Sequence, residues 1–293
     1  MPKAFEKGAG RLPGRADPRC LEGGRRSAVG PYGLVAADMD GTLLDGKGEI
    51  AEETVREIRR IVEAGVLFVV TTGRAIQGVE KYPALWGLKG PVVAYNGAMV
   101  VDAGTREILF ERGLRRDDAA KIIELGRRRG TTMCIWSRHQ LYGNRLDARI
   151  HEYKRLSGVE PLPVEDWEEL LDRGIAKILW VDDEEAIRRA QAELVPGMFK
   201  ETTACTSKPV FLEFFNSRAS KAAALEFIGK LRGIRREEMM AIGDGANDLD
   251  MIRYAGMGVA MENAEEEVKR SAGFITSSNE EDGVGRAIRQ FLG

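Results

Sequence analysis

Beyond a glycine-rich head, short apolar runs of strand length alternate with stretches whose apolar residues recur at helical spacing. Residues 34–37, 66–70 and 91–94 are the apolar runs. Residues 52–63 carry apolar side chains three and four positions apart, and a glycine follows shortly after them. With a further helix at about 75–86, this strand–helix alternation predicts a parallel sheet joined by right-handed crossovers.

The middle of the chain mixes strands and helices without this strict alternation. A hairpin is predicted over residues 98–110. After it we expect helices at 117–129, 148–156, 167–171 and 184–194, and strands at 132–137, 177–181 and 210–215. Such a mixture is typical of a separate α+β domain.

The C-terminal part returns to the alternating pattern. It predicts helices at 220–231, 247–254, 265–270 and 283–291, separated by strands at 239–242, 258–261 and 273–276. The two alternating parts therefore predict one α/β core that an inserted domain interrupts. We expect the core at 32–112 and 217–293, and the inserted domain at 113–216.

The first 31 residues differ from the rest in charge and composition. They hold seven Lys or Arg against three Asp or Glu, together with ten Gly or Pro, and show no apolar periodicity. The acidic residues, and the lack of an apolar core of roughly 7–15 residues, exclude a secretory signal peptide. We therefore predict a disordered basic extension over residues 1–31.

Composition narrows the possible functions of the body. The whole chain has a formal net charge of −2, so the body without its basic head is acidic, which argues against nucleic-acid binding. No apolar stretch approaches the roughly 18–20 residues that span a bilayer, so no membrane segment is expected. Three separated Cys and only two His exclude a disulfide scaffold and a zinc site of thiolates or imidazoles, and they fit a reducing compartment. Carboxylates and lysine must therefore carry most of the chemistry.

The first strand runs into two carboxylates, within Asp38-Met39-Asp40-Gly41-Thr42. Ligands of open α/β sheets bind at such strand ends. Residues two apart on an extended segment face the same way, so the two carboxylates should converge. One could attack phosphorus while the other moves a proton. An Asp-rich turn is the plain alternative.

A second strand end carries Asp244, followed by Asn247 and Asp248 at the start of a helix, where capping alone would explain them. Together with Asp38 and Asp40, this motif would bring four carboxylates to one edge of the sheet. Such a set of hard oxygen ligands suits Mg²⁺.

Two smaller signals lie between these motifs. Thr72, Gly73 and Arg74 follow another strand, where a hydroxyl could donate to a phosphoryl oxygen or simply stabilise a turn. Lys221 opens a helix, a position that the helix dipole disfavours for a cation, although a solvated surface lysine is the plain alternative. The two aspartate motifs, each at the end of an apolar strand, favour chemistry over turns.

With these motifs the chain resembles the haloacid dehalogenase superfamily of phosphohydrolases, and within it the Cof-type branch. The resemblance covers nearly all of residues 33–293, and its strongest parts are 38–45, 71–74, 95–98, 220–221 and 243–251. It implies a Rossmann-like parallel-sheet core and, over residues 113–216, an α+β cap of the C2 type that covers the site. It also implies Mg²⁺ as cofactor and a small phosphorylated metabolite as substrate.

The resemblance also implies roles for individual residues. Asp38 would be the nucleophile and Asp40 the general acid and base. Thr72 and Lys221 would hold the phosphoryl oxygens. Further candidates for contact with phosphate or substrate are Gly41, Gly73, Arg74, Asn96 and Asn247.

In the implied metal site, Asp244 would ligate Mg²⁺ together with Asp38 and the backbone carbonyl of Asp40. Asp248 would hold metal-bound water. Asn247 would orient the phosphate or Lys221.

The expected activity is therefore Mg²⁺-dependent hydrolysis of small phosphate monoesters, with sugar phosphates as leading substrates, in a cytoplasmic monomer or homodimer. Pyridoxal phosphate or another small phosphoester stays open, as does a phosphotransferase or mutase on the same scaffold. A carbon–halogen hydrolase and a non-catalytic binding protein are more distant alternatives. Candidates to read the leaving group surround a predicted hairpin of the cap: Trp136, Arg138, His139, Tyr142 and Arg145.

Overall fold

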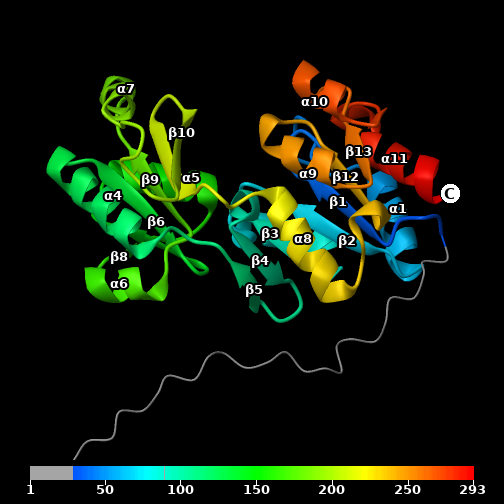
Figure 1. The fold of residues 1–293 in the computed structure, drawn as a ribbon, viewed down its shortest axis with the longest axis horizontal. Coiled ribbons are helices and arrows are strands. Elements are labelled where there is room, and N and C mark those ends of the chain that lie inside the picture. Colours follow the sequence, from blue (N-terminus) through cyan, green and yellow to red (C-terminus); the bar gives the residue numbers. More distant parts are fainter. Residues whose placement is uncertain (1–28, 89) are drawn as a thin grey trace, which may run out of the picture.

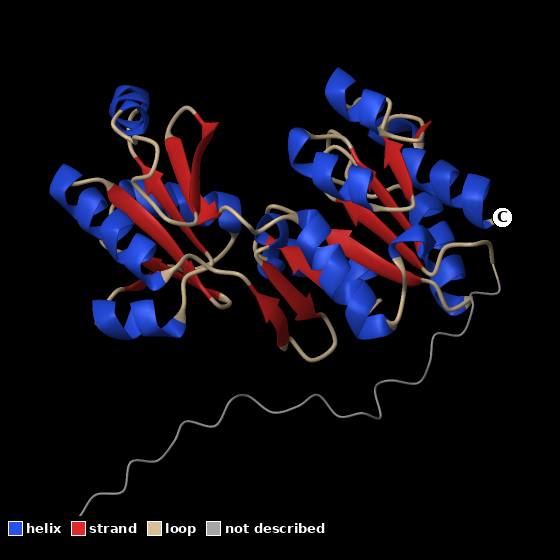
Figure 2. Cartoon of the chain, viewed as in Figure 1, coloured by secondary structure: helices blue, strands red, loops and turns tan. Residues whose placement is uncertain are grey.

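The computed structural model describes residues 29–88 and 90–293, which form two sheets with helices packed against them (Figures 1 and 2). The predicted basic extension, residues 1–31, lies outside the described residues except for its last three positions. Val29, the first of these, packs against an apolar cluster of the larger sheet. The predicted α/β core with an inserted α+β domain is confirmed.

The larger sheet has eight strands in the order β14-β13-β12-β1-β2-β3-β4-β5. Six are parallel: β1 (Leu34–Asp38), β2 (Leu67–Thr71), β3 (Pro91–Ala94), β12 (Met239–Gly243), β13 (Met257–Ala260) and β14 (Phe274–Ile275). The predicted hairpin adds antiparallel β4 (Met99–Asp102) and β5 (Ile108–Glu111). Because β1 and β12 are neighbours, segments from opposite ends of the chain finish at one edge of the sheet.

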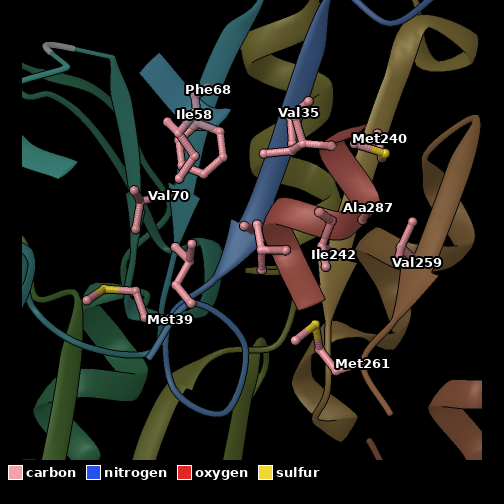
Figure 3. Packing of buried hydrophobic residues seen from close by; sticks show 14 of the residues in the cluster. Val35, Met39, Ile58, Phe68, Val70, Met240, Ile242, Val259, Met261 and Ala287 are labelled. Carbon is pink, nitrogen blue, oxygen red and sulfur yellow. The ribbon is translucent and has the colours of Figure 1, made fainter. Parts of the chain in front are cut away.

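Helices cover both faces of this sheet. One face is covered by α1 (Glu52–Glu63), α10 (Glu266–Ser271) and α11 (Gly283–Leu292), and the other by α8 (Lys221–Arg232) and α9 (Leu249–Tyr254). Successive strand residues point to opposite faces. Val35 therefore joins the cluster under α1 and α11, as Figure 3 shows, whereas Leu34 and Ala36 join the cluster under α8 and α9.

The predicted helix at about 75–86 is wrong in one respect, because the segment forms two short helices, α2 (Ile76–Glu80) and α3 (Pro83–Trp86). Pro83 has no backbone N–H and disfavours helical geometry at the residue before it. Tyr82 accordingly has φ −111° and ψ 87°, which ends the first helix and caps the second.

The smaller sheet has six strands in the order β10-β11-β9-β6-β7-β8. They are β6 (Thr132–Ser137), β7 (Gln140–Gly143), β8 (Leu162–Pro163), β9 (Lys177–Val181), β10 (Thr202–Lys208) and β11 (Phe211–Asn216). The predicted strands near β6, β9 and β11 are confirmed. The sequence analysis missed β10, whose hydroxyl-rich sequence TTACTSK has no apolar alternation. Antiparallel pairing with β11 makes it a strand.

The two faces of the smaller sheet have different neighbours. Three helices cover its outer face, α4 (Arg116–Arg129), α6 (Trp167–Arg173) and α7 (Glu184–Ala192), while α5 (Ala148–Ser157) packs on the inner face. Trp136, Leu179 and Phe211 on the inner face belong to one apolar cluster with Ile76 and Tyr95 of the core. Core and inserted domain therefore share a packed interface. No helix in the described part of the chain is long and apolar enough to cross a membrane.

Hydrogen bonds join the two segments where the chain passes between the domains. Arg112 Nη1 donates to the Arg218 carbonyl at 2.9 Å, and Asn216 Nδ2 donates to the Gly113 carbonyl at 2.8 Å. The outgoing and returning segments therefore run together beside the end of β5.

Candidate active site

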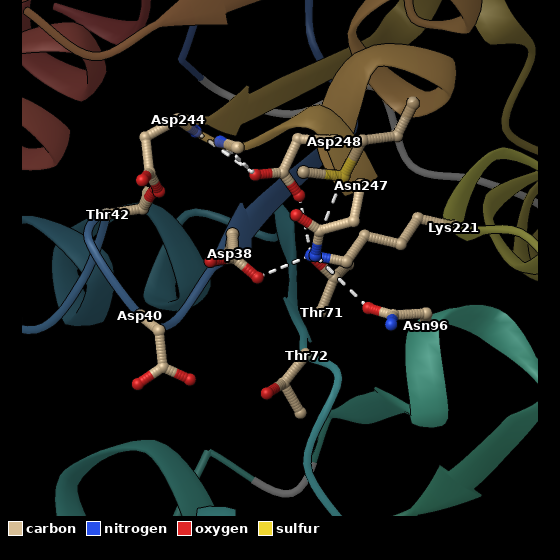
Figure 4. A network of polar contacts seen from close by, with 12 residues as sticks. Asp38, Asp40, Thr42, Thr71, Thr72, Asn96, Lys221, Asp244, Asn247 and Asp248 are labelled. Atoms are coloured by element: carbon tan, nitrogen blue, oxygen red, sulfur yellow. Dashed lines mark hydrogen bonds and ion pairs between the residues drawn. The ribbon is translucent and has the colours of Figure 1, made fainter. Parts of the chain in front are cut away.

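Three carboxylates meet where β1 and β12 end. Asp38 is the last residue of β1, and Asp244 and Asp248 follow β12 in its loop to α9. One oxygen of each lies within 4.8 Å of the others (Figure 4). Parallel neighbouring strands finish at the same edge, so the topology alone brings these distant positions together.

Lys221 lies inside this cluster and is fully buried. Its Nζ donates to an Asp38 carboxylate oxygen and, at 2.6 Å, to Asp248 Oδ1. Burial acts against the charge of the ammonium, but the two carboxylates outweigh it and raise its pKa. The alternative of a solvated surface lysine is therefore wrong.

The second oxygen of Asp248 is held by the backbone of its own loop. Asp248 Oδ2 accepts hydrogen bonds from the N–H groups of Asp244 at 3.1 Å and Gly245 at 3.0 Å. A Cβ at Gly243 would lie 2.5 Å from the Asp248 Cβ, so only glycine permits this close approach. The loop thereby fixes the direction in which Asp248 faces Lys221.

The loop that follows β1 holds the Asp244 side chain in place. Gly41 has φ +79°, and a Cβ there would stand 2.3 Å from Asp244 Oδ2. The neighbouring Thr42 donates its hydroxyl to Asp244 Oδ1 at 2.6 Å. Thr42 is a positioning residue that the sequence analysis did not single out, although its place beside Gly41 was the available signal.

The cluster holds more negative charge than its lysine can balance. Burial raises the pKa of the Asp38 carboxyl to about 7, with Lys221 opposing the shift and Asp248 adding to it. Burial also raises the pKa of Asp244 to about 6, against the Thr42 hydrogen bond. Crowded carboxylates with raised pKa values, all hard oxygen donors, fit a divalent cation such as Mg²⁺.

Asp40 is not part of this cluster, so the expected convergence of its side chain with Asp38 is wrong. Arg74 Nε donates to Asp40 Oδ2 at 2.9 Å, and Arg74 Nη2 donates to the other oxygen. The spacing argument requires an extended segment, but β1 ends at Asp38 and the chain turns there. Asp40 therefore stands at the cavity wall with 58% of its side chain exposed.

The remaining predicted residues lie around the same edge. Buried Thr72 accepts the N–H of Arg74 at its hydroxyl oxygen, at 3.1 Å, which leaves its own proton available. Asn247 Nδ2 donates to Asn96 Oδ1 at 3.1 Å, so the amides bridge β12 and β3 (Figure 4). A Cβ at Gly73 would lie 3.1 Å from that same Asn96 oxygen.

The edge of the sheet that carries the carboxylates opens into a cavity of about 710 Å³ between core and inserted domain. Its core side includes Asp38, Asp40, Arg74, Asn96, Asp244 and Asn247. Of the five cap candidates, Trp136 lines this cavity, whereas His139 contacts the Gln77 side chain and the Arg106 carbonyl at the domain interface. The sequence analysis did not identify Lys177 and Glu213, which also line the cavity from the inserted domain.

The fold and this site define a class of protein. The sequence model of the haloacid dehalogenase-like hydrolases matches residues 35–288, so the chain belongs to this family, as its motifs suggested. It is a phosphatase that acts on small phosphate monoesters.

Particular relatives match over nearly their whole length. YxeH of Bacillus subtilis is 37% identical over 266 residues, which cover 89% of this chain and 98% of the relative. The 5-amino-6-(5-phospho-D-ribitylamino)uracil phosphatase YcsE of the same organism is 31% identical over 260 residues, covering 88% and 95%. A crystal structure of a haloacid dehalogenase-like hydrolase from Bacteroides thetaiotaomicron superposes with a TM-score of 0.79 at 31% identity, covering 88% of this chain and 99% of that one.

Proposed function

We propose that this phosphatase depends on Mg²⁺, hydrolyses sugar phosphates and related polyol phosphates, and forms an aspartyl-phosphate on Asp38. In this proposal residues 32–112 and 217–293 form the catalytic core, and residues 113–216 form a cap that reads the leaving group. The observation that carries it is the buried cluster of Asp38, Lys221 and Asp248 beside Asp244, at the floor of the cavity.

In the first step a carboxylate oxygen of Asp38 attacks phosphorus, and the bond from phosphorus to the leaving oxygen breaks. Asp40 donates a proton to that oxygen, so the leaving group departs as an alcohol. Lys221 and the Thr72 hydroxyl donate hydrogen bonds to the phosphoryl oxygens, which lowers the cost of their charge. Arg74 orients Asp40 through its two hydrogen bonds.

In the second step Asp40 takes a proton from water, whose oxygen attacks the phosphorus of the aspartyl-phosphate. The bond between phosphorus and Asp38 breaks, which releases inorganic phosphate and restores both aspartates. The residues suited to hold Mg²⁺ are Asp38 and Asp244, with the Asp40 carbonyl, while Asp248 would hold a water of the ion. When bound, the cation neutralises charge on the phosphoryl group and keeps Asp38 ionised.

The cavity and a relative support the proposed kind of leaving group. The cavity is larger than the phosphoryl site requires, and both aromatic rings and polar or charged side chains line it. The substrate named for YcsE carries a phosphorylated ribityl chain, which is a polyol phosphate. Both features support a hydroxylated leaving group.

Replacing the nucleophile tests the proposal. Asp38→Asn should lower kcat by at least about 10⁴-fold on every phosphate ester, because no carboxylate is left to attack phosphorus. The variant should stay folded, since Asp248 still pairs with Lys221. Phosphate release from a panel of sugar phosphates with Mg²⁺, alongside circular dichroism, measures both effects. Residual turnover above a tenth of wild type would refute the covalent route, and transfer of phosphate to a second sugar would indicate a phosphotransferase.

A further inference from the structure

An ion pair stands on the inner face of the cap sheet, next to the apolar side chains that pack against the core. In β9 Lys177 lies directly opposite Trp136 of β6, so both side chains share one face. In β11 Glu213 lies opposite Leu179 of β9, and this pair projects to the same side. The apolar neighbours belong to the cluster that packs against the core, which makes two charges there an exception that requires a reason.

The two side chains of the pair are nearly buried, and their charged atoms lie within hydrogen-bonding distance. Lys177 Nζ lies 2.9 Å from Glu213 Oε2, and only 12% and 17% of the two side chains are exposed. Burial opposes the charge on Lys177, but the attraction of Glu213 outweighs it and raises the pKa of the ammonium. The same attraction, with a hydrogen bond from Ser207, lowers the pKa of Glu213 against the effect of burial. Both groups are therefore charged at neutral pH.

Stability alone does not account for such a pair. Removing two charges from water costs about as much as their attraction returns, and apolar residues of similar volume commonly stabilise a fold as well or better. The pair does have unused hydrogen-bonding capacity. Among the described residues Lys177 donates to Glu213, which occupies one of its three N–H groups, and both side chains line the cavity.

Aromatic side chains line the cavity between this pair and the carboxylate cluster. The ring of Tyr95, at the end of β3, lies 5.7 Å from the ring of Trp136. Trp136 Nε1 donates to the Tyr153 hydroxyl at 3.0 Å, and the Tyr153 ring meets Phe211 edge-on at 5.9 Å. All four residues line the cavity, and within the described chain the buried Tyr95 hydroxyl has no hydrogen-bond partner. The wall thus combines aromatic ring faces with polar and charged side chains.

We propose that the Lys177–Glu213 pair is the specificity-determining element of the cap, which binds hydroxyl groups of the leaving group at the end remote from the phosphate. This inference rests on the proposed function. A hydroxyl can donate to the Glu213 carboxylate while accepting from the Lys177 ammonium, and neither an apolar nor a singly charged group can do both. Glu213 already neutralises Lys177, so the pair disfavours a second anion such as a carboxylate or phosphate.

A double variant tests the pair without leaving a buried charge unpaired. Lys177→Met with Glu213→Met keeps the volume but removes both hydrogen-bonding ends, and its thermal stability should not fall. We compare kcat/KM for the best substrate of a sugar and polyol phosphate panel with kcat/KM for 4-nitrophenyl phosphate, which has no hydroxyl on its leaving group. The ratio should fall at least about 30-fold, while 4-nitrophenyl phosphate hydrolysis stays within about threefold of wild type.

Two further variants complete the experiment. Glu213→Gln keeps the shape and a hydrogen bond to Lys177 and should lower the same ratio about tenfold, which provides a readout if the double variant does not fold. As a matched control, Lys154→Met with Glu160→Met removes an ion pair of the cap that does not line the cavity. Its ratio should equal that of wild type.

The outcomes separate this inference from the proposed function. An unchanged ratio in the double variant or in Glu213→Gln would overturn the role of the pair. So would a wild type that prefers 2-phosphoglycolate or 4-nitrophenyl phosphate to every sugar and polyol phosphate. A wild type that hydrolyses no sugar or aryl phosphate with Mg²⁺ would instead overturn the proposed function, and the inference with it.

Discussion

Asp38 is an acid that the fold places in an unfavourable environment. It is 5% exposed and has two other carboxylates beside it, which with burial explains why its pKa is raised to about 7. Lys221 opposes this rise in the pKa of Asp38 through its positive charge. These conditions suit the nucleophilic role proposed for Asp38, because a weakly hydrated carboxylate beside a fixed cation can attack an electron-poor phosphorus.

The raised pKa values predict how cation binding depends on pH. Below pH 7 the metal-free protein holds a proton on Asp38, and below pH 6 it holds another on Asp244. A cation must displace these protons, so Mg²⁺ affinity should fall about 100-fold between pH 7.5 and 5.5. Titration calorimetry in buffers of different ionisation enthalpy measures both the affinity and the protons released.

Two variants control this measurement. Asp40→Asn should change the pH dependence only slightly, because its side chain pairs with Arg74 outside the cluster and makes the smallest named contribution to the raised pKa of Asp244. Asp244→Asn should weaken Mg²⁺ binding and reduce the number of protons released. A Mg²⁺ affinity that stays constant between pH 7.5 and 5.5 would contradict the proposed ligands.

At the scale of elements, α4 fixes the start of β10 through one side chain. Asp118, 4% exposed in the first turn of α4, accepts hydrogen bonds from the N–H groups of Lys200 and Glu201 and from the Thr202 hydroxyl. This contact holds the first residue of β10 in place, and antiparallel pairing with β11 orders the rest of this hydroxyl-rich strand. The strand matters for the site, because Ser207 of β10 holds Glu213.

Replacing this contact should destabilise the cap. Asp118→Asn keeps the size but places an amide against backbone N–H groups, which should lower the free energy of unfolding by about 1–3 kcal/mol at pH 7. Asp117→Asn is the matched control, because its exposed ion pair with Lys200 contributes at most about 1 kcal/mol. Urea denaturation of both variants measures the difference.

The effect of Asp118 should also depend on pH. Although burial acts to raise the pKa of Asp118, the hydrogen bonds from Glu201, Lys200 and Thr202 lower it. The stabilisation is therefore fully present above the ordinary pKa of an aspartate, near 4, and is lost as the pH falls through the lowered value. Wild type and Asp118→Asn should converge in stability in strong acid, and a constant difference would contradict the hydrogen-bond assignment.

At the scale of the whole molecule, the strand order brings the two parts of the core together around the site. The N-terminal segment contributes to this closure: the Tyr32 ring packs edge-on against Phe291 of α11 at 6.3 Å. Both rings belong to or pack on the cluster beneath α1 and α11. The first described residues, from Val29 to Tyr32, are therefore part of the folded core.

A deletion and a point substitution should show that residues 29–32 stabilise the fold, whereas residues 1–28 are not needed for activity. Deleting residues 1–28 should leave kcat/KM for phosphate esters unchanged, because the proposed catalytic residues begin at Asp38. Tyr32→Ala should instead lower the free energy of unfolding by about 2–4 kcal/mol, because Tyr32 is only 9% exposed. Phosphate-release assays and thermal denaturation test both variants, and lost activity in the truncated protein would show that the head contributes to function.

The sequence predicts the strands of the larger sheet, the presence of an inserted domain, and the carboxylates and lysine that meet at the edge of the sheet. It can do so because apolar runs and the polar residues that end them are local features, and parallel strands bring their ends to one edge. The three-dimensional arrangement alone determines that Asp40 pairs with Arg74 outside the cluster and that Thr42 donates to Asp244. It also determines that Thr202–Lys208 is a strand and that Lys177 meets Glu213 in the cavity. These features depend on which side chains a turn or a neighbouring strand brings into contact. Because such contacts join residues far apart in the sequence, no local sequence pattern predicts them.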